Sequence, residues 1–150
     1  MKLYPLLVLL LCFGCGFHAV SENNHDATPR DNALKLDLEV EPLIIEYGGT
    51  LFIELTITNN TPETIARVFG SGCIYGFSIL TPAGTRVGPE PRICTMNAPT
   101  IRYKPGEVVV RKFEWRWDDS HISPGKYLLR AGLGEYGMDE SPPPIEIELR

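Results

Sequence analysis

Hydrophobic and polar residues alternate along most of the chain after residue 33, a pattern typical of β-strands that bury one face. The alternation is clearest in five segments: 34–40, 51–58, 109–117, 126–133 and 145–149. Four shorter segments are further strand candidates: 43–46, 64–69, 74–80 and 85–87. Turn-forming residues such as Gly, Pro and Asn separate these segments. No convincing helix is predicted after residue 15.

Residues 105–133 contain the two strands around which we expect the core to form. Each begins after a Pro-Gly pair, and a polar turn at 118–124 joins them. On the first strand, the residues that share the apolar face are Val109, Phe113, Trp115 and Trp117, with Arg111 as the exception. The second strand carries Tyr127 and further apolar residues on one face. We therefore predict an antiparallel hairpin that supplies much of the aromatic core.

The number and spacing of these strands define the expected fold. Seven to nine short strands with regular turn signals predict an all-β domain, an immunoglobulin-like antiparallel β-sandwich covering residues 33–150. Two irregular stretches interrupt it, at 88–100 and 134–144. Long irregular loops in compact domains are often functional, and the first of these stretches is the longer.

The N-terminal segment indicates export. In residues 1–15, Lys2 precedes an apolar run at 6–13 that is too short to span a bilayer, so we interpret the segment as a signal peptide. Its end resembles the lipobox of bacterial lipoproteins, in which a small residue, here Gly14, precedes a cysteine that receives lipid after cleavage. This predicts lipidation of Cys15, membrane attachment through that lipid, and a place in the cell envelope. The alternative is an ordinary secretory signal that is cut nearby.

Residues 16–32 are polar and aperiodic, which predicts a disordered tether between the anchor and the domain. His18 and His25 lie in this tether. Their spacing is not that of metal ligands, so we interpret them as solvated linker residues, with weak metal binding as the alternative.

Composition excludes one class of partner. The chain has 150 residues, of which 22% are charged and 43% hydrophobic, and a formal net charge of -5. These proportions are ordinary for a globular domain. Because the net charge is negative, we expect no nucleic-acid partner.

Two cysteines lie within the predicted domain, Cys73 and Cys94. Since the N-terminal segment predicts an oxidising compartment, we expect a disulfide between them. A free catalytic thiol and a zinc site are the alternatives. His121, which is the only histidine of the domain, lies in the predicted turn, and neither cysteine has a neighbour at metal-ligand spacing. No cofactor is expected.

Several turn and core residues carry a resemblance to a known family. They are Phe69, Ser71, Gly72, Tyr75 and Phe77, then Pro105-Gly106-Glu107, Trp117, Pro124-Gly125, Tyr127 and Ala131. This set resembles the BsuPI domain, an intracellular proteinase inhibitor with an immunoglobulin-like fold. The resemblance extends over nearly all of residues 34–149, and it implies a non-enzymatic domain that binds a serine protease. The family's target is cytoplasmic, and an exported chain would not meet it.

The irregular stretch after residue 88 supplies the candidate site for such a partner. Cys94 precedes Met96 by two residues, a spacing similar to the reactive loops of Kazal-type and bacterial subtilisin inhibitors. The candidate partner-binding loop comprises Arg92, Thr95, Met96 and Asn97, with Met96 as the specificity residue and Met96-Asn97 as the bond presented. The alternative is that Met96 packs under a covered loop.

Two other functions compete with inhibition. The first is an envelope accessory or scaffold protein without inhibitory activity, for which residues 135–140 could be the contact or simply a solvated loop. The second is an enzyme, for which the only clustered acid/base set is Asp118, Asp119 and His121. These residues lie where a turn favours Asp and Ser, and no nucleophile or phosphate-binding motif accompanies them. We therefore predict a binding module and no catalysis.

Overall fold

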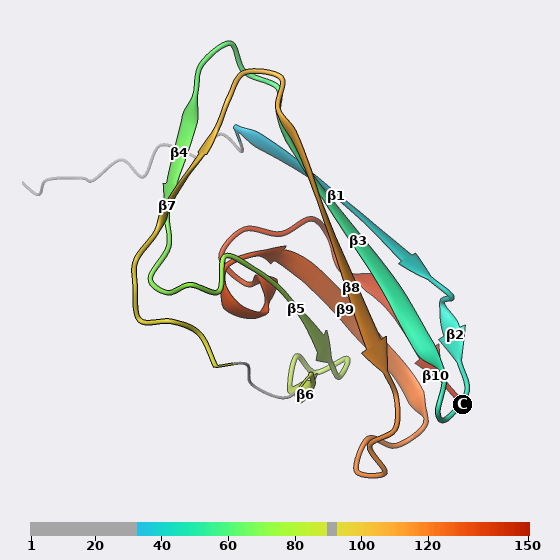
Figure 1. Cartoon of the computed structure of the whole chain (residues 1–150). Coiled ribbons are helices and arrows are strands. Elements are labelled where there is room, and N and C mark those ends of the chain that lie inside the picture. Colours follow the sequence, from blue (N-terminus) through green and yellow to red (C-terminus); the bar gives the residue numbers. More distant parts are fainter. Residues whose placement is uncertain (1–32, 90–92) are drawn as a thin grey trace, which may run out of the picture.

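The computed structural model describes residues 33–89 and 93–150 (Figure 1). The predicted signal segment, Cys15, the tether and Arg92 lie outside the described residues. The elements are β1 (Leu34–Glu41), β2 (Ile44–Ile45), β3 (Thr50–Asn59), β4 (Ile65–Val68), β5 (Tyr75–Leu80), β6 (Arg86–Gly88), β7 (Thr100–Tyr103), β8 (Val108–Arg116), β9 (Gly125–Leu133), the single-turn helix η1 (Glu135–Gly137) and β10 (Ile145–Leu149). Within these ranges, no helix is long and apolar enough to cross a membrane.

The strands form two main sheets that pack against each other (Figure 1). One sheet has the order β1-β3-β8, and the other has the order β2-β10-β9-β5-β6. Neighbouring strands are antiparallel except β2 and β10, which run parallel. The all-β sandwich is thus confirmed, with one parallel pair that the sequence did not predict.

The predicted hairpin between β8 and β9 is wrong. The two strands lie in different sheets, because β8 pairs with β3 while β9 pairs with β5 and β10. The turn at 118–124 therefore crosses from one layer to the other. The prediction of an aromatic core is confirmed, since Trp115, Trp117 and Tyr127 are all buried. Their apolar faces meet across the sandwich, and the Trp117 indole N–H donates to the carbonyl of Ile122 at 3.2 Å.

The alternation in the sequence matches the burial of the strands. In β3, the side chains of Leu51, Ile53, Leu55 and Ile57 are almost wholly buried, and the residues between them are exposed or half-buried. Arg111, the exception on the apolar face of β8, lies over the ring of Tyr75, with its guanidinium 4.6 Å from the ring centre. Arg111 is itself exposed, so its side chain covers the Tyr75 ring while its charged end stays in contact with water.

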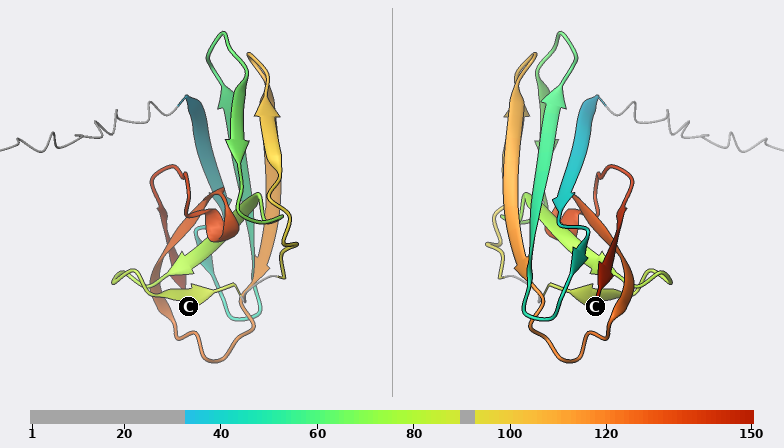
Figure 2. Two further views of the ribbon diagram at one scale, coloured as in Figure 1. Left: turned by 90° about the vertical axis from the view of Figure 1, so that its left-hand side faces the viewer. Right: turned by 90° about the vertical axis from the view of Figure 1, so that its right-hand side faces the viewer.

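A small third sheet, β4-β7, lies beside the end of the sandwich (Figure 2). β3 leads into β4 and β7 leads into β8, and the buried side chain of Asn59 holds the junction. The Asn59 amide donates to the carbonyls of Glu63 at 2.7 Å and Tyr103 at 2.9 Å, and its oxygen accepts from the backbone and side chain of Thr61. Since every polar atom of this buried side chain has a partner, the junction has a defined geometry. β7 is a strand that the sequence did not predict.

Tyr103 joins this small sheet to the main core. Its side chain is fully buried, and its hydroxyl lies 3.2 Å from that of Tyr75 on β5. Burial, followed by this hydrogen bond, raises the pKa of Tyr103 well above its usual value. The phenol is therefore neutral, and its contact with Tyr75 links the small sheet to β5, which begins two residues after Cys73.

Candidate functional site

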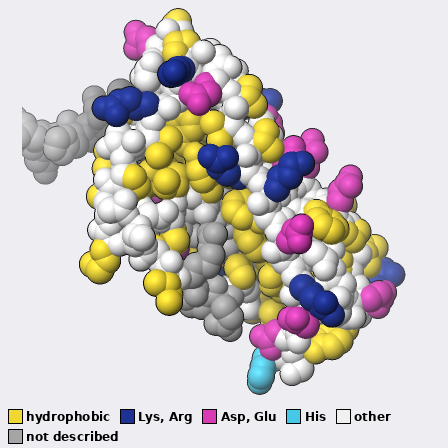
Figure 3. Space-filling view, viewed as in Figure 1, with side chains coloured by type: hydrophobic (Ala, Val, Ile, Leu, Met, Phe, Trp, Pro, Cys, Tyr) yellow, Lys and Arg dark blue, Asp and Glu magenta, His cyan; other side chains and the backbone are white. Residues whose placement is uncertain are grey.

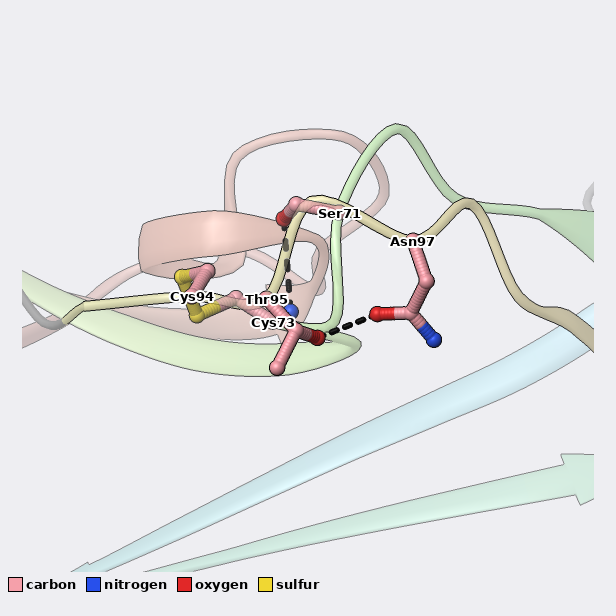
Figure 4. Close-up of a disulfide and its surroundings, with 5 residues drawn as sticks. All are labelled: Ser71, Cys73, Cys94, Thr95 and Asn97. Carbon is pink, nitrogen blue, oxygen red and sulfur yellow. Dashed lines mark hydrogen bonds between the residues drawn. A yellow bond between two sulfur atoms is a disulfide. The ribbon is translucent and has the colours of Figure 1, made fainter.

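A disulfide links Cys73, just before β5, to Cys94 in the connection between β6 and β7 (Figure 4). The two Cα atoms lie 5.3 Å apart, within the usual range for a disulfide. The predicted pairing is confirmed. The alternatives of a free catalytic thiol and of a zinc site for these two cysteines are wrong, because both sulfurs are used in the bond.

Two backbone hydrogen bonds continue this attachment along the segment 93–99, which we call the anchored loop. The N–H of Gly72 donates to the carbonyl of Thr95 at 2.9 Å, and the N–H of Phe69 donates to the carbonyl of Pro99 at 3.0 Å. The disulfide and the first bond lie before Met96, and the second bond lies after it. The loop is thus fixed on both sides of its central residue.

The side chains of Thr95 and Asn97 meet across Met96 (Figure 4). The Thr95 hydroxyl donates to the side-chain oxygen of Asn97. Both side chains lie over the bare Cα of Gly72: a Cβ there would lie 3.2 Å from the Asn97 oxygen and 3.3 Å from the Thr95 Cβ. Only glycine at position 72 leaves room for this pair, so Gly72 helps to set the shape of the loop.

Met96 projects from the anchored loop, and its side chain is 97% exposed. The expectation that it packs under a covered loop is therefore wrong. Thr95 and Asn97 are also exposed, and so is Ile93, at 103%. Hydrophobic side chains project at the edge of the molecule where this loop lies (Figures 1 and 3). Three of the four predicted loop residues, Thr95, Met96 and Asn97, are exposed in the anchored loop, and Arg92 lies outside the described residues.

The acid/base set in the β8–β9 connection has the geometry of a turn. One oxygen of Asp119 accepts hydrogen bonds from both the backbone N–H and the ring Nδ1 of His121, each at 2.8 Å. These bonds, the backbone one first, lower the pKa of the Asp119 carboxyl. Asp118 points to Arg116, 3.7 Å away. An ionised, turn-capping carboxylate beside an exposed imidazole matches the structural role expected of Asp in turns.

The second irregular stretch folds against its own domain. A Cβ at Gly76 of β5 would lie 2.5 Å from the backbone nitrogen of Tyr136, which shows how closely the two segments approach. Glu140 accepts from Arg67 of β4 at 3.2 Å, and the sulfur of Met138 accepts from Ser78 at 3.8 Å. We call residues 134–140 the packed loop. It is therefore not a freely solvated loop, and its possible role as a contact for a partner stays a prediction.

No group of three or more His, Cys, Asp or Glu residues that could hold a metal ion occurs within residues 33–89 and 93–150. His18 and His25 lie outside these ranges, so their interpretation as solvated linker residues, with weak metal binding as the alternative, stays a prediction of the sequence alone.

Together, the fold and the site define a β-sandwich domain that presents an exposed loop fixed at its base. The chain belongs to the family described as BsuPI, intracellular proteinase inhibitor, whose family model matches residues 38–135. The match includes both cysteines of the disulfide and the whole anchored loop. A proteinase is therefore the class of partner that the family indicates.

Two solved structures of other proteins are similar to this chain at low identity. An alkylpurine DNA glycosylase from Pseudomonas fluorescens, AlkC, is 17% identical, with a TM-score of 0.51 over 79% of this chain and 30% of its own. The C-terminal domain of wzt is 15% identical, with a TM-score of 0.49 over 79% of this chain and 74% of its own. The chain thus spans less than a third of the glycosylase, and the likeness concerns the fold alone. Comparison with curated protein sequences gives no match.

Two residues of the site were missed in the sequence. Gly72 was named only as a residue of the family resemblance, although a glycine next to a cysteine can also mark a close approach between backbones. Ile93 was not singled out, although an isoleucine directly before a disulfide-bonded cysteine in a polar stretch was the available signal.

Proposed function

We propose that this protein inhibits a serine protease by presenting the anchored loop as a substrate-like segment. Met96 would enter the specificity pocket, and Met96-Asn97 would be the bond presented to the nucleophile. The single observation that carries this proposal is the 97% exposure of Met96 in a segment fixed on both sides. Transfer of such an exposed apolar side chain from water into an apolar pocket contributes favourable free energy to binding.

The attachments of the loop explain how a substrate-like segment inhibits. A loop that is already ordered loses little conformational entropy on binding, so more of the contact energy appears as affinity. If the protease cuts after Met96, the disulfide and the Gly72–Thr95 bond hold one new end. The Phe69–Pro99 bond holds the other. Both ends then stay in the cleft, and the cut bond can re-form.

We further propose that inhibition takes place in the cell envelope, with the domain attached through lipid on Cys15. Disulfides persist in oxidising compartments and are rare in the cytoplasm, so the Cys73–Cys94 bond supports export. The protease would accordingly be an envelope or extracellular enzyme, although the family is described as intracellular.

The test of inhibition uses the full chain purified from a bacterial host and a panel of serine proteases. The proposal predicts tight inhibition of at least one protease with an apolar specificity pocket. It also predicts a slowly formed species cut once, between Met96 and Asn97, in the intact mass of the complex. Rapid digestion by every such protease, or a first cut at another bond of the domain, would contradict it.

The test of location is the intact mass and the membrane fraction of the same protein, with and without reduction. Cleavage before Cys15 with added lipid, and a gain of two protons on reduction, are the expected results. An uncleaved, soluble product with reduced cysteines would exclude the envelope and return a cytoplasmic protease to consideration.

The scaffold alternative placed its contact at residues 135–140. In the structure, these residues contact β4 and β5 of their own domain. A partner that bound there would meet only the outer side of the packed loop, so the geometry favours inhibition through the anchored loop.

A further inference from the structure

We propose that Ile93 is a second specificity residue of the anchored loop. The target protease would then have two apolar pockets, one for Met96 and one for the side chain three residues before it. This inference rests on the proposed function, because it assigns a further contact to the same loop.

Ile93 and Met96 are the two most exposed large hydrophobic side chains in the part of the chain that the structure describes. Their exposures are 103% and 97%, and the next value, that of Val68, is 74%. Isoleucine is among the residue types most often buried. Two such residues, both fully exposed and separated by only two positions, indicate a surface that is covered when a partner is bound.

The two residues between them are the ones that attach the loop to the domain. The side chain of Cys94 points to Cys73 (Figure 4), and the carbonyl of Thr95 accepts from the N–H of Gly72. Because both middle residues are directed toward the domain, the flanking side chains are left on its outer side.

This arrangement sets the chemistry and the spacing of the partner's cleft. Three residues of chain span at most about 11 Å, so the Cα atoms of Ile93 and Met96 lie no farther apart than that. The two pockets must therefore lie close together in one cleft, and both must be apolar. A protease with an acidic specificity pocket is disfavoured, since neither side chain carries a positive charge.

The experiment compares Ile93→Ala with the wild type against two probes. One is a subtilisin-type protease first shown, with tetrapeptide substrates ending in Met, to prefer Ile over Ala at the first position. The other is a chymotrypsin-type protease shown to have no such preference. Phe52→Ala is the matched control, because Phe52 is a large hydrophobic residue that is 55% exposed on the outer face of β3.

With the first probe, Ile93→Ala should raise the inhibition constant about 30-fold, the loss expected for one apolar side chain removed from a pocket. The second probe should register less than about a threefold change, and Phe52→Ala should leave both constants unchanged. The melting temperature of Ile93→Ala should equal that of the wild type. Weaker inhibition by an equally stable protein supports a direct contact between Ile93 and the protease.

Three results would overturn the inference. If the wild type inhibits and Ile93→Ala is equally potent against the first probe, Ile93 contacts no pocket while the proposed function stands. If Ile93→Ala weakens inhibition of both probes alike, or lowers the melting temperature, Ile93 acts on the shape of the loop. If the wild type inhibits no protease of the panel, the two probes included, both the inference and the proposed function with Met96 fail.

Discussion

The anchored loop and the packed loop look alike in the sequence and are opposite in the structure. Both are irregular, proline-flanked segments between strands. The packed loop approaches β5 and β9 so closely that a Cβ on Gly76 or Gly132 would meet its backbone. The anchored loop touches the domain through a disulfide and two backbone bonds, and leaves the side chains of Ile93 and Met96 exposed.

The difference shows two ways of ordering a loop. Packing orders the backbone by burying the loop, so the loop contributes to the stability of the fold. Anchoring at the base orders the backbone while the side chains stay available to a partner, so it contributes to binding at low entropic cost. Changes in the packed loop should therefore lower stability, and changes in the anchored loop should weaken inhibition.

The largest expected effect follows from removing the disulfide by the paired changes Cys73→Ser and Cys94→Ser. Because the bond closes a loop with a sequence separation of 21 residues, the free energy of unfolding should fall by about 3 kcal/mol. The loop should also lose its fixed end and become an ordinary substrate, cut rapidly after Met96. Urea unfolding and cleavage kinetics measure the two effects. A double variant that stays uncut and inhibits as well as the wild type would show that anchoring is not needed.

The second prediction concerns the packed loop. In Gly76→Ala, the added Cβ would lie 2.5 Å from the nitrogen of Tyr136 and 3.0 Å from two further backbone atoms of the loop. Overpacking of this kind should lower the free energy of unfolding by about 2 kcal/mol, measured in urea, while the folded protein still inhibits. Gly70→Ala is the matched control, since a Cβ there meets nothing within 4 Å. Equal stability of the two variants would contradict close packing of this loop.

Gly72→Ala tests the effect of an added Cβ beneath the anchored loop. A Cβ at position 72 would displace the Thr95 and Asn97 side chains, so the segment around Met96 should lose its preset shape. We expect inhibition to weaken about tenfold, or about 1.4 kcal/mol, with little change in the melting temperature. Gly70→Ala again serves as the control, now for the inhibition constant. If Gly72→Ala inhibits as well as Gly70→Ala, the contact between Thr95 and Asn97 does not shape the site.

The smallest expected effect comes from two methionines, one in each loop. Met138→Ala removes a sulfur that accepts hydrogen bonds from Ser78 and Arg130, and should cost about 1 kcal/mol of stability. Met96→Ala removes an exposed side chain, and should change stability by less than about 0.5 kcal/mol. Thermal unfolding of the two variants side by side is the measurement. A larger loss for Met96→Ala would mean that Met96 belongs to the fold.

Much of the fold could be predicted because burial has the period of the strand. The alternation in 34–40 and 51–58 gives the inner and outer faces of β1 and β3 directly. That β8 and β9 lie in different sheets could not be predicted. Two strands that each have an apolar face show the same sequence pattern whether they pair side by side or face each other across a sandwich. β7 was missed because its four residues follow a proline-rich stretch.

The site was predictable only in part. The disulfide follows from the two cysteines and the expected compartment, whereas the role of Thr95, Met96 and Asn97 as a contact stays a prediction. The exposure of Met96 depends on contacts with Gly72 and Phe69, about 25 residues earlier in the chain, which local sequence patterns do not contain. The inward folding of the packed loop likewise depends on glycines in two other strands.

The most direct test of the account is the inhibition constant of Met96→Asp, measured beside the wild type on the most strongly inhibited protease of the panel. A carboxylate in an apolar pocket should weaken inhibition at least about 100-fold. The melting temperature should stay unchanged, because Met96 is 97% exposed. Equal inhibition by the two proteins would contradict the account and place the contact with the protease on another face of the sandwich.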